Sequence, residues 1–376
     1  MHLSNLMDLD KLEKHIQDRY VSRQKHPHLP LWILNYTPEA TFSDTWDEIT
    51  TLTRGLIIND QQEVIARGFS KFFNLGDTRR PETALDKLLP GIPEVTEKLD
   101  GSLGIYWAYQ GEYGIATRGS FTSEQSQWAT QYFRKHHAYW ADHFPEWVTP
   151  VFEIIYPANR IVVQYDWEGL TLLSMIDNKT GYEPPYAILQ AYCESWPGFP
   201  LVKKFARSLG QYMADNDKNA EGYVLTWKHP HQAPFRVKVK FSEYVRLHKL
   251  ITGVSPKAIW EILAQGQSLE PMRAGDLPVH FTAWVGKWQA KLQSEYQAIE
   301  QEALEVFPQW QPTEITNGVS ERKQAAAVFT QYPRLAAILF KMLDHQPYEL
   351  LIWKMLKPKV EAGDVFKRDE TPLPDE

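Results

Sequence analysis

The sequence predicts an α+β protein, with an antiparallel, sheet-rich domain over residues 1–250 and an all-α domain over residues 251–376. Two observations carry this prediction. Short runs of β-branched and aromatic residues, separated by turn residues, recur up to about residue 250. Beyond Phe241 such runs disappear, and apolar residues recur at helical spacing instead. A chain of 376 residues is long enough for more than one domain.

The predicted strands of the first part follow one another with turns between them. Each is a short run of mostly apolar residues, of the length that strands adopt. They lie at residues 31–36, 55–59, 64–69, 103–109, 113–117, 151–155, 170–176, 223–227 and 236–240. One helix is predicted over 123–147, where aromatic residues recur at three- and four-residue spacing, and a second over about 184–213.

The second part carries only helical signals. Ser255 followed by Pro256 is a typical helix start, with a hydroxyl cap and a proline in the first turn. Trp284, Trp288 and Leu292 form one stripe of a long helix that continues to about residue 299. Further helices are predicted over about 320–330, 333–344 and 347–357.

Composition and charge exclude several classes of protein. The net charge of −7 lacks the basic excess of a strongly cationic nucleic-acid binder, so any site for a polyanion must be local. No apolar run reaches the length of a membrane span, so no membrane partner is expected. The single cysteine, Cys193, excludes an internal disulfide and a cysteine-based zinc site. The first residues lack the apolar core of a signal peptide, and we therefore predict a cytoplasmic protein.

The segment 97–102 carries the first chemical signal. Glu97 and Lys98 end a β-type run, Asp100 and Gly101 form a turn, and a predicted strand follows. Taken alone, such a lysine is more often a solvated residue before a hairpin. The functional alternative is a nucleophile. Because a lysine of ordinary pKa, near 10.4, is neutral in only about one molecule in two thousand at pH 7, neighbouring cations and burial are expected to lower the pKa of Lys98.

Cationic residues that could surround this lysine recur along the chain. They are Arg54, Lys71, Arg118, Lys238 and Lys240. The two-residue period of a strand places Lys238 and Lys240 on the same face, which suits the binding of a phosphate group. The alternative for that pair is a solvent-facing strand edge.

Two carboxylates complete the set of candidate site residues. Glu153 interrupts the apolar run 151–155, and Glu221 stands just ahead of the run 223–227. An acid in a β-run more often faces solvent. In a sheet that also carries a nucleophilic lysine and a phosphate clamp, however, both are candidate ligands of a ribose or of Mg²⁺-bound water.

The order of these motifs resembles that of the covalent nucleotidyltransferases, meaning polynucleotide ligases and mRNA capping enzymes. Further strings narrow the resemblance to the phage-type RNA ligase 1 family, the ATP-dependent ligases that repair cleaved tRNA. These strings are Lys71-Phe72-Phe73-Asn74-Leu75, Gly119-Ser120, Asn159-Arg160-Ile161-Val162, Thr180-Gly181-Tyr182 and Tyr244-Val245-x-Leu247-His248. The similarity covers roughly residues 30–250, and many separate strings agree in order.

The resemblance implies an adenylyltransferase domain over residues 1–250 and a helical domain over 251–376 that could select the RNA. It also implies an enzyme that uses ATP with Mg²⁺ or Mn²⁺ to seal RNA ends bearing a 5′-phosphate and a 3′-hydroxyl. Lys98 would carry AMP, and an RNA-adenylate would follow. The expected nucleotide contacts are Arg54, Lys71, Glu97, Arg118, Glu153, Lys238 and Lys240, and Glu221 would belong to the metal environment. Cleaved tRNA is the expected substrate, and an end-healing kinase or phosphatase is an expected partner.

Two other functions remain open from the sequence. An mRNA capping enzyme or a DNA ligase would share the lysine motif, but those enzymes usually continue into a β-rich domain, whereas helical signals follow here. A non-catalytic RNA-binding relative could keep the fold. Such a protein would have little reason to retain Lys98 together with Lys238 and Lys240.

Overall fold

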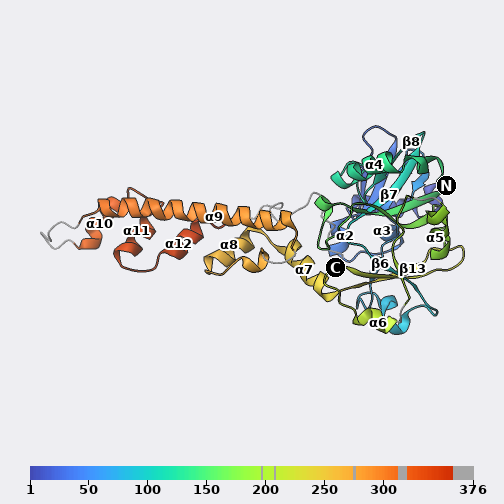
Figure 1. Cartoon of the computed structure of the whole chain (residues 1–376). Coiled ribbons are helices and arrows are strands. Elements are labelled where there is room, and N and C mark those ends of the chain that lie inside the picture. Colours follow the sequence, from blue (N-terminus) through green and yellow to red (C-terminus); the bar gives the residue numbers. More distant parts are fainter. Residues whose placement is uncertain (196–197, 207–208, 274–276, 312–319, 359–376) are drawn as a thin grey trace. The chain divides into compact units, whose positions relative to one another are not determined.

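The computed structural model describes residues 1–195, 198–206, 209–273, 277–311 and 320–358. The chain divides into two compact units, one of Met1–His248 and one that begins at Lys249 (Figure 1). Of the predicted domain 251–376, residues 359–376 lie outside the described residues. The first unit combines three sheets with helices and the second is helical, which confirms the predicted α+β class.

The first sheet contains the N-terminal strands. Its order is β1-β2-β3-β4, with all neighbours antiparallel. The strands are β1 (Val21–Lys25), β2 (Leu31–Tyr36), β3 (Arg54–Asn59) and β4 (Val64–Ala66). Leu34 and Leu56 are fully buried in one apolar cluster, and their neighbours Ile33 and Ile57 in another, because successive residues of a strand point to opposite faces of the sheet.

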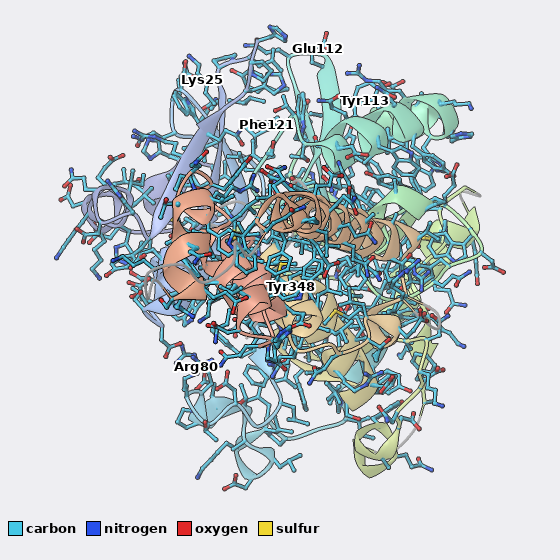
Figure 2. The ribbon with its side chains drawn as sticks, turned by 90° about the vertical axis from the view of Figure 1, so that its left-hand side faces the viewer. Lys25, Arg80, Glu112, Tyr113, Phe121 and Tyr348 are labelled. Carbon is cyan, nitrogen blue, oxygen red and sulfur yellow. The ribbon has the colours of Figure 1, made fainter. Side chains whose placement is uncertain are left out.

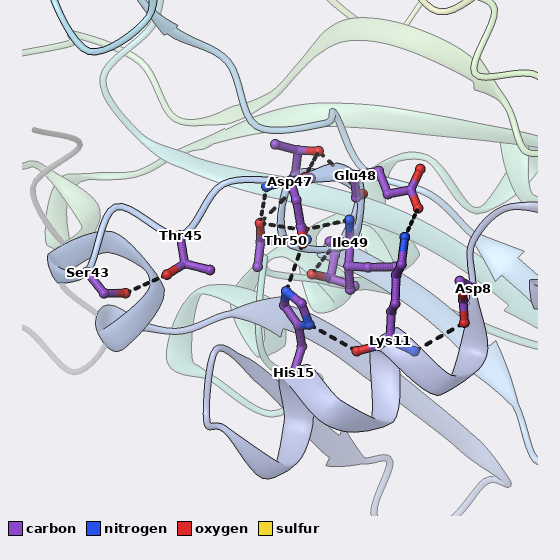
Figure 3. A network of polar contacts seen from close by, with 11 residues as sticks. Asp8, Lys11, His15, Ser43, Thr45, Asp47, Glu48, Ile49 and Thr50 are labelled. Carbon is purple, nitrogen blue, oxygen red and sulfur yellow. Dashed lines mark hydrogen bonds and ion pairs between the residues drawn. The ribbon is translucent and has the colours of Figure 1, made fainter.

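Three short helices pack near this sheet: α1 (Leu9–Gln17), α2 (Pro38–Phe42) and α3 (Glu48–Leu52). Asp47 caps α3 by accepting hydrogen bonds from the N–H groups of Ile49 and Thr50, each at 2.9 Å. The Nε2 atom of His15 on α1 lies 2.9 Å from an Asp47 carboxylate oxygen (Figure 3). This polar network fixes α1 against the start of α3.

The second sheet has the order β10-β9-β7-β8 and is antiparallel throughout. Its strands are β7 (Ser102–Tyr109), β8 (Glu112–Ala116), β9 (Val148–Ile155) and β10 (Gly169–Asp177). The helix α4 (Glu124–His136) packs on this sheet through Phe133, which is fully buried beside Tyr106 and Phe152. Tyr113 lies on β8, the edge strand of this sheet (Figure 2). Its ring contacts that of Phe133.

The third sheet joins segments that are far apart in the sequence. Its order is β11-β6-β12-β13-β5, antiparallel except for the parallel pair β13 and β5. The strands are β5 (Phe73–Asn74), β6 (Glu94–Lys98), β11 (Lys204–Phe205), β12 (Gly222–Trp227) and β13 (Phe235–Lys240). This sheet carries both predicted lysine motifs.

Two predicted helices of the first unit are wrong in extent. The predicted helix 123–147 ends as α4 at His136, and a 3-10 helix (Ala138–Asp142) follows. The predicted helix 184–213 is interrupted: the structure has α5 (Tyr186–Ser195), strand β11 and α6 (Leu209–Ala214). Gly198 and Pro200 disfavour a continuous helix here, and the Pro200 carbonyl instead accepts a hydrogen bond from the N–H of Leu172 on β10.

The described part of the second unit contains helices and connections only, as predicted. The helix α7 (Ser242–Gly253) spans the boundary between the units, and α8 (Pro256–Ala264), α9 (Val279–Val306), α10 (Glu321–Phe329), α11 (Ala336–Leu343) and α12 (Glu349–Met355) follow. Ser255 caps α8 as expected. Ile299 of α9 and Phe329 of α10 share one apolar core. No helix in the described ranges has both the length and the apolar character needed to cross a membrane.

Candidate active site

A cavity of about 450 Å³ lies in the first unit, where the three sheets meet, and is called the first cavity here. Every predicted site residue except Lys71 and Lys238 lines it, namely Arg54, Glu97, Lys98, Arg118, Glu153, Glu221 and Lys240. Residues from β2, β3, β6, β9, β12 and β13 therefore converge on one space, although the sequence separates them widely.

Strand pairing places the two lysine motifs beside each other. Gly222 of β12 pairs with Lys98 of β6 on one side and with Lys240 of β13 on the other. A Cβ atom at Gly222 would lie 1.9 Å from the Val239 carbonyl oxygen, and its φ of +146° is in the region that favours glycine. Glycine at this position thus permits the close pairing that brings Lys98 and Lys240 together.

Glu221 connects these two lysines. Its Oε1 atom lies 2.8 Å from the Lys98 ammonium and 3.2 Å from the Lys240 ammonium, and its side chain is only 4% exposed. Burial alone would raise the pKa of Glu221, but the charges of Lys98 and Lys240 outweigh burial and lower that pKa below its ordinary value. The site therefore holds a buried carboxylate that is ionised at neutral pH.

Asp100 organises the backbone around the lysine. Its carboxylate accepts hydrogen bonds from the N–H groups of Val162 and Val163, at 2.7 and 2.8 Å, and from the hydroxyl of Tyr244, at 2.7 Å. Burial and the nearby charge of Glu221 raise the pKa of Asp100 to about 6, although these hydrogen bonds oppose the rise. Asp100 fixes the turn after Lys98, because it holds segments from three parts of the chain.

Glu153 contacts Gly101, the next residue of that turn. Its Oε1 atom accepts a hydrogen bond from the Gly101 N–H at 2.9 Å. A Cβ atom at Gly101 would lie 2.4 Å from the Ile154 carbonyl oxygen, so a residue without a side chain is needed. Burial raises the pKa of Glu153 to about 8, with the charge of Lys98 opposing the rise and that of Glu221 adding to it. Glu153 can therefore hold a proton at neutral pH.

Tyr36 holds two of the predicted cations. The Arg118 guanidinium donates a hydrogen bond to the Tyr36 hydroxyl at 2.7 Å and lies 4.8 Å from the ring centre. The Lys71 ammonium lies 3.5 Å from the same hydroxyl. Lys71 itself lines a neighbouring cavity rather than the first one, so the structure links it to the site through Tyr36.

The remaining predicted residues occupy different positions around the cavity. Arg54 donates to the Phe69 carbonyl at 3.5 Å, and its guanidinium lies 5.8 Å from the Phe72 ring. Lys238 is 2% exposed, does not line the first cavity, and contributes with Lys98 and Lys240 to lowering the pKa of Glu221. Burial raises the pKa of Glu97, with the charge of Lys203 opposing the rise.

Several residues of the site were missed by reasoning from the sequence. One of them is Tyr36, the last residue of β2. Another is Tyr165, which belongs to none of the sequence motifs, although its hydroxyl accepts a hydrogen bond from the Asp100 N–H at 2.8 Å. Asn159 accepts from the Ser102 hydroxyl at 3.2 Å and donates to the Ile154 carbonyl at 2.8 Å. Asn159 and Tyr244 belong to sequence strings that resemble the RNA ligase 1 family, and this resemblance was the one signal that could have identified them.

The chemistry available here is the binding and transfer of a phosphorylated group. Arginine and lysine side chains surround one cavity, and one lysine, Lys98, sits against a buried carboxylate. Among the described residues, no group of three or more histidine, cysteine, aspartate or glutamate side chains is arranged to hold a metal ion. A divalent ion in this cavity would thus need ligand phosphates besides Glu221.

Comparison with known proteins places these features in a family. The model of the RNA ligase family matches residues 52–245, more than half of the chain. A Thermovibrio ammonificans protein assigned as an RNA ligase is 28% identical over 207 residues, which are 53% of each chain. A protein of Autographa californica nuclear polyhedrosis virus, assigned as a bifunctional polynucleotide kinase/RNA ligase, is 27% identical over 275 residues, 66% of this chain and 38% of its own.

The chain thus spans about half the length, or less, of these relatives. Among solved structures, an archaeal ATP-dependent RNA ligase aligns over 92% of this chain and 98% of its own, with 15% identity and a TM-score of 0.47. The match over residues 52–245 confirms the family that the sequence motifs suggested. The chain therefore belongs to the RNA ligase family.

Proposed function

We propose that this protein is an ATP-dependent RNA ligase whose nucleophile is Lys98. The observation that supports this most is the position of the lysine. Lys98 ends β6 at the wall of the 450 Å³ cavity, beside Glu221 and Lys240, and Arg54 and Arg118 line the same cavity. A cationic cavity of this size suits a nucleotide triphosphate, and membership of the RNA ligase family supports the same activity.

The first step would be adenylylation of the lysine. After losing a proton, Nζ of Lys98 attacks the α-phosphorus of ATP, the bond from that phosphorus to the β-bridging oxygen breaks, and pyrophosphate leaves. The product is a phosphoramidate between Lys98 and AMP. The proton leaves to solvent, and Glu221, whose oxygen lies 2.8 Å from Nζ, favours the protonated ammonium until then.

Two further transfers would seal the RNA. An oxygen of the RNA 5′-phosphate attacks the AMP phosphorus, the phosphorus–nitrogen bond breaks, and Lys98 is released with its proton restored. The 3′-hydroxyl of the second RNA end then attacks the 5′-phosphate, the proton of that hydroxyl is lost, and AMP leaves. Both transfers build negative charge on phosphate oxygens, which the surrounding cations would stabilise.

The remaining residues would act mainly by binding. Lys238 and Lys240 would hold the α-phosphate, Arg54 and Lys71 the leaving phosphates, and Glu97 and Arg118 other parts of the nucleotide. Glu153 would bind the ribose, since its carboxyl lies at the turn that follows Lys98. Tyr36 would position Arg118 and Lys71 because both cations contact its hydroxyl.

A divalent cation, Mg²⁺ or Mn²⁺, fits this cavity only together with ATP. Glu221 is a buried, ionised carboxylate that could supply a protein ligand, and the nucleotide phosphates would supply others. The bound ion would neutralise charge on those phosphates. Lys98 and Lys240, which now pair with Glu221, would then be available to the phosphates instead.

We assign the adenylylation chemistry to residues 1–250 and RNA selection to the helical domain 251–376. We propose cleaved tRNA as the substrate, because the chain shares sequence motifs with tRNA-repair ligases. One relative is assigned as a combined kinase and ligase, which supports a separate end-healing kinase or phosphatase as the partner of this chain. We propose a cytoplasmic setting, since a chain with one cysteine suits a reducing compartment.

Incubation of the protein with ATP or GTP, each labelled on the α-phosphate, tests this proposal. We expect a protein-bound label from ATP with Mg²⁺ or Mn²⁺, and joining of a 5′-phosphorylated RNA strand to a 3′-hydroxyl end. A label from GTP would point to a capping enzyme, and joining of DNA alone to a DNA ligase. The absence of label from either nucleotide, with RNA binding retained, would leave a non-catalytic relative.

A further inference from the structure

A second cavity, of about 290 Å³, lies beside the first, and Lys71 is the one residue of its lining that the proposed ligation steps use. It is lined by the segment that follows β4, by the turn after β10 and by the start of β13. The two cavities share the side chains that separate them, Phe69, Phe72, Glu183 and Arg236. Arg67 lines only the second cavity.

Arg67 is buried, and no carboxylate of the described residues forms an ion pair with its guanidinium. It is 5% exposed, and its backbone N–H donates to the Thr149 hydroxyl at 3.0 Å. Its Nη1 atom has no hydrogen-bond acceptor among the described residues. A buried donor that forms no hydrogen bond is costly, and a buried guanidinium without an anion more so. Burial lowers the pKa of Arg67, although the charges of Glu183 and Asp177 oppose this shift.

The backbone around Arg67 leaves space for its guanidinium. Gly181, in the turn after β10, has a φ of +72°, and a Cβ atom there would lie 2.9 Å from Nη2 of Arg67. The same Cβ would lie 3.1 Å from Cβ of Ala233. Any larger residue at 181 would thus displace the Arg67 guanidinium. Glycine at 181 allows the guanidinium to lie against this turn, at the wall of the cavity.

The second cavity has an excess of cationic groups. Its lining includes Arg67, Lys71 and Arg236 against the carboxylates of Glu82 and Glu183. Glu183 forms an ion pair with Arg236, whose guanidinium lies 4.4 Å from the Phe69 ring. Glu183 is therefore already paired with Arg236, and the guanidinium of Arg67 keeps donor capacity for an anionic ligand.

We propose that the second cavity binds a phosphate-type oxyanion, with the Arg67 guanidinium as its principal donor. The cavity has room for a phosphate or a pyrophosphate group, and a guanidinium presents paired donors that match phosphate oxygens. The hydroxyl groups of Ser70 and Thr51 in the lining offer further donors. The anion would be inorganic phosphate, free pyrophosphate or the terminal phosphate of a nucleotide. This inference does not depend on the ligase activity.

The test is calorimetric titration of the full chain with orthophosphate, pyrophosphate and ATP, at constant ionic strength set with chloride. We expect Arg67→Met to weaken binding of the oxyanion by about tenfold or more. Loss of this binding in Lys240→Met but not in Arg67→Met would place the anion in the first cavity, which Lys240 lines, and would contradict the proposal. Arg80→Met is the matched control, because Arg80 is a largely buried arginine paired with Asp44 outside the lining of both cavities. It should leave binding unchanged.

The three ligands distinguish the source of the anion. If orthophosphate or pyrophosphate binds in a manner that depends on Arg67, the natural ligand is a free inorganic anion. If only ATP does so, the ligand is the nucleotide. If Arg67→Met binds all three ligands as the unchanged protein does, the proposal is wrong. Glu183→Gln supplies a second measurement should Arg67→Met fail to fold: loss of its carboxylate should tighten oxyanion binding severalfold, and unchanged or weaker binding would contradict the site.

Discussion

The ammonium of Lys98 lies 2.8 Å from a carboxylate oxygen of Glu221, and the same oxygen lies 3.2 Å from the ammonium of Lys240. The predicted nucleophile is thus held in an ion pair, inside a cavity, with a second cation beside it. A carboxylate at this distance favours the charged ammonium, whereas attack on ATP needs the neutral amine. Glu221 should therefore control the pH at which Lys98 reacts.

The first prediction concerns that control. In Glu221→Gln, the rate of adduct formation should begin to rise at a pH about one unit lower or more, because the neighbouring carboxylate no longer stabilises the ammonium. Its maximum should be lower, since a proposed metal ligand is lost. The measurement is the rate of lysine adenylylation against pH at saturating ATP. Glu97→Gln, on the strand that carries Lys98, is the control for the pH at which the rate begins to rise. A pH profile in Glu221→Gln identical to that control would contradict the role of the ion pair.

The second prediction concerns the strand pairing that unites the lysines. Gly222→Ala should lower the free energy of unfolding by about 2–4 kcal/mol, because its Cβ would meet the Val239 carbonyl oxygen at 1.9 Å in a left-handed conformation. Gly210→Ala is the control: Gly210 lies in helix α6, and nothing lies within 4 Å of a Cβ added there. That variant should be neutral or gain up to about 1 kcal/mol. Denaturant unfolding measures both, and equal stabilities would refute the packing argument.

The third prediction follows from the raised pKa of Glu153. In the unfolded chain this carboxyl ionises near its ordinary pKa of 4.5, whereas in the folded protein burial raises the pKa to about 8. The folded state therefore binds more protons between these values, and the stability contributed by Glu153 is greatest below pH 4.5 and declines as the pH rises to about 8. Glu153→Gln keeps an acceptor for the Gly101 N–H but does not titrate.

The stability of Glu153→Gln relative to the unchanged protein should accordingly increase between pH 5 and pH 8. The slope should be up to about 1.4 kcal/mol per pH unit. Denaturant unfolding at several pH values gives this difference directly. A difference that stays constant with pH would mean that Glu153 ionises in the folded protein as it does in the unfolded chain.

The sequence predicted the strands better than the helices of the first unit. Strands 31–36 and 223–227 were recognised because β-branched and aromatic residues run between clear turns. Strand β1 (Val21–Lys25) was missed because all its residues after Val21 are exposed and polar, as at a sheet edge. The interruption of the predicted helix 184–213 by β11 depends on pairing with β6, about 100 residues away, which no local pattern reveals.

The site could be predicted as a set of residues but not as a geometry. Strand periodicity placed Lys238 and Lys240 on one face of a strand. The order of the motifs identified Lys98 and Glu221 as candidate site residues. That Glu221 pairs with Lys98 follows from the register of β6 against β12, two segments more than 100 residues apart. Tyr36 was missed because its role depends on contacts with Arg118 and Lys71, which come from other parts of the chain.

The fourth prediction separates the two units. A fragment of residues 1–253 should still form the lysine adduct, because every proposed nucleotide contact lies before residue 241 and Tyr244, which holds Asp100, is retained. The same fragment should lose any preference for a cleaved tRNA over an unstructured RNA strand. Adduct yield and the ratio of sealing rates on the two RNAs measure this. An unchanged ratio would remove the proposed RNA-selecting role of the helical domain.

The most direct test of the central claim is to locate the AMP on the protein. After incubation with ATP and Mg²⁺, peptide mapping by mass spectrometry should find AMP attached through an acid-labile bond to Lys98, and to no other lysine. Lys98→Ala should fold as the unchanged protein does and carry no AMP. Attachment at another residue, or an undiminished yield of adduct in Lys98→Ala, would contradict the assignment of Lys98 as the nucleophile.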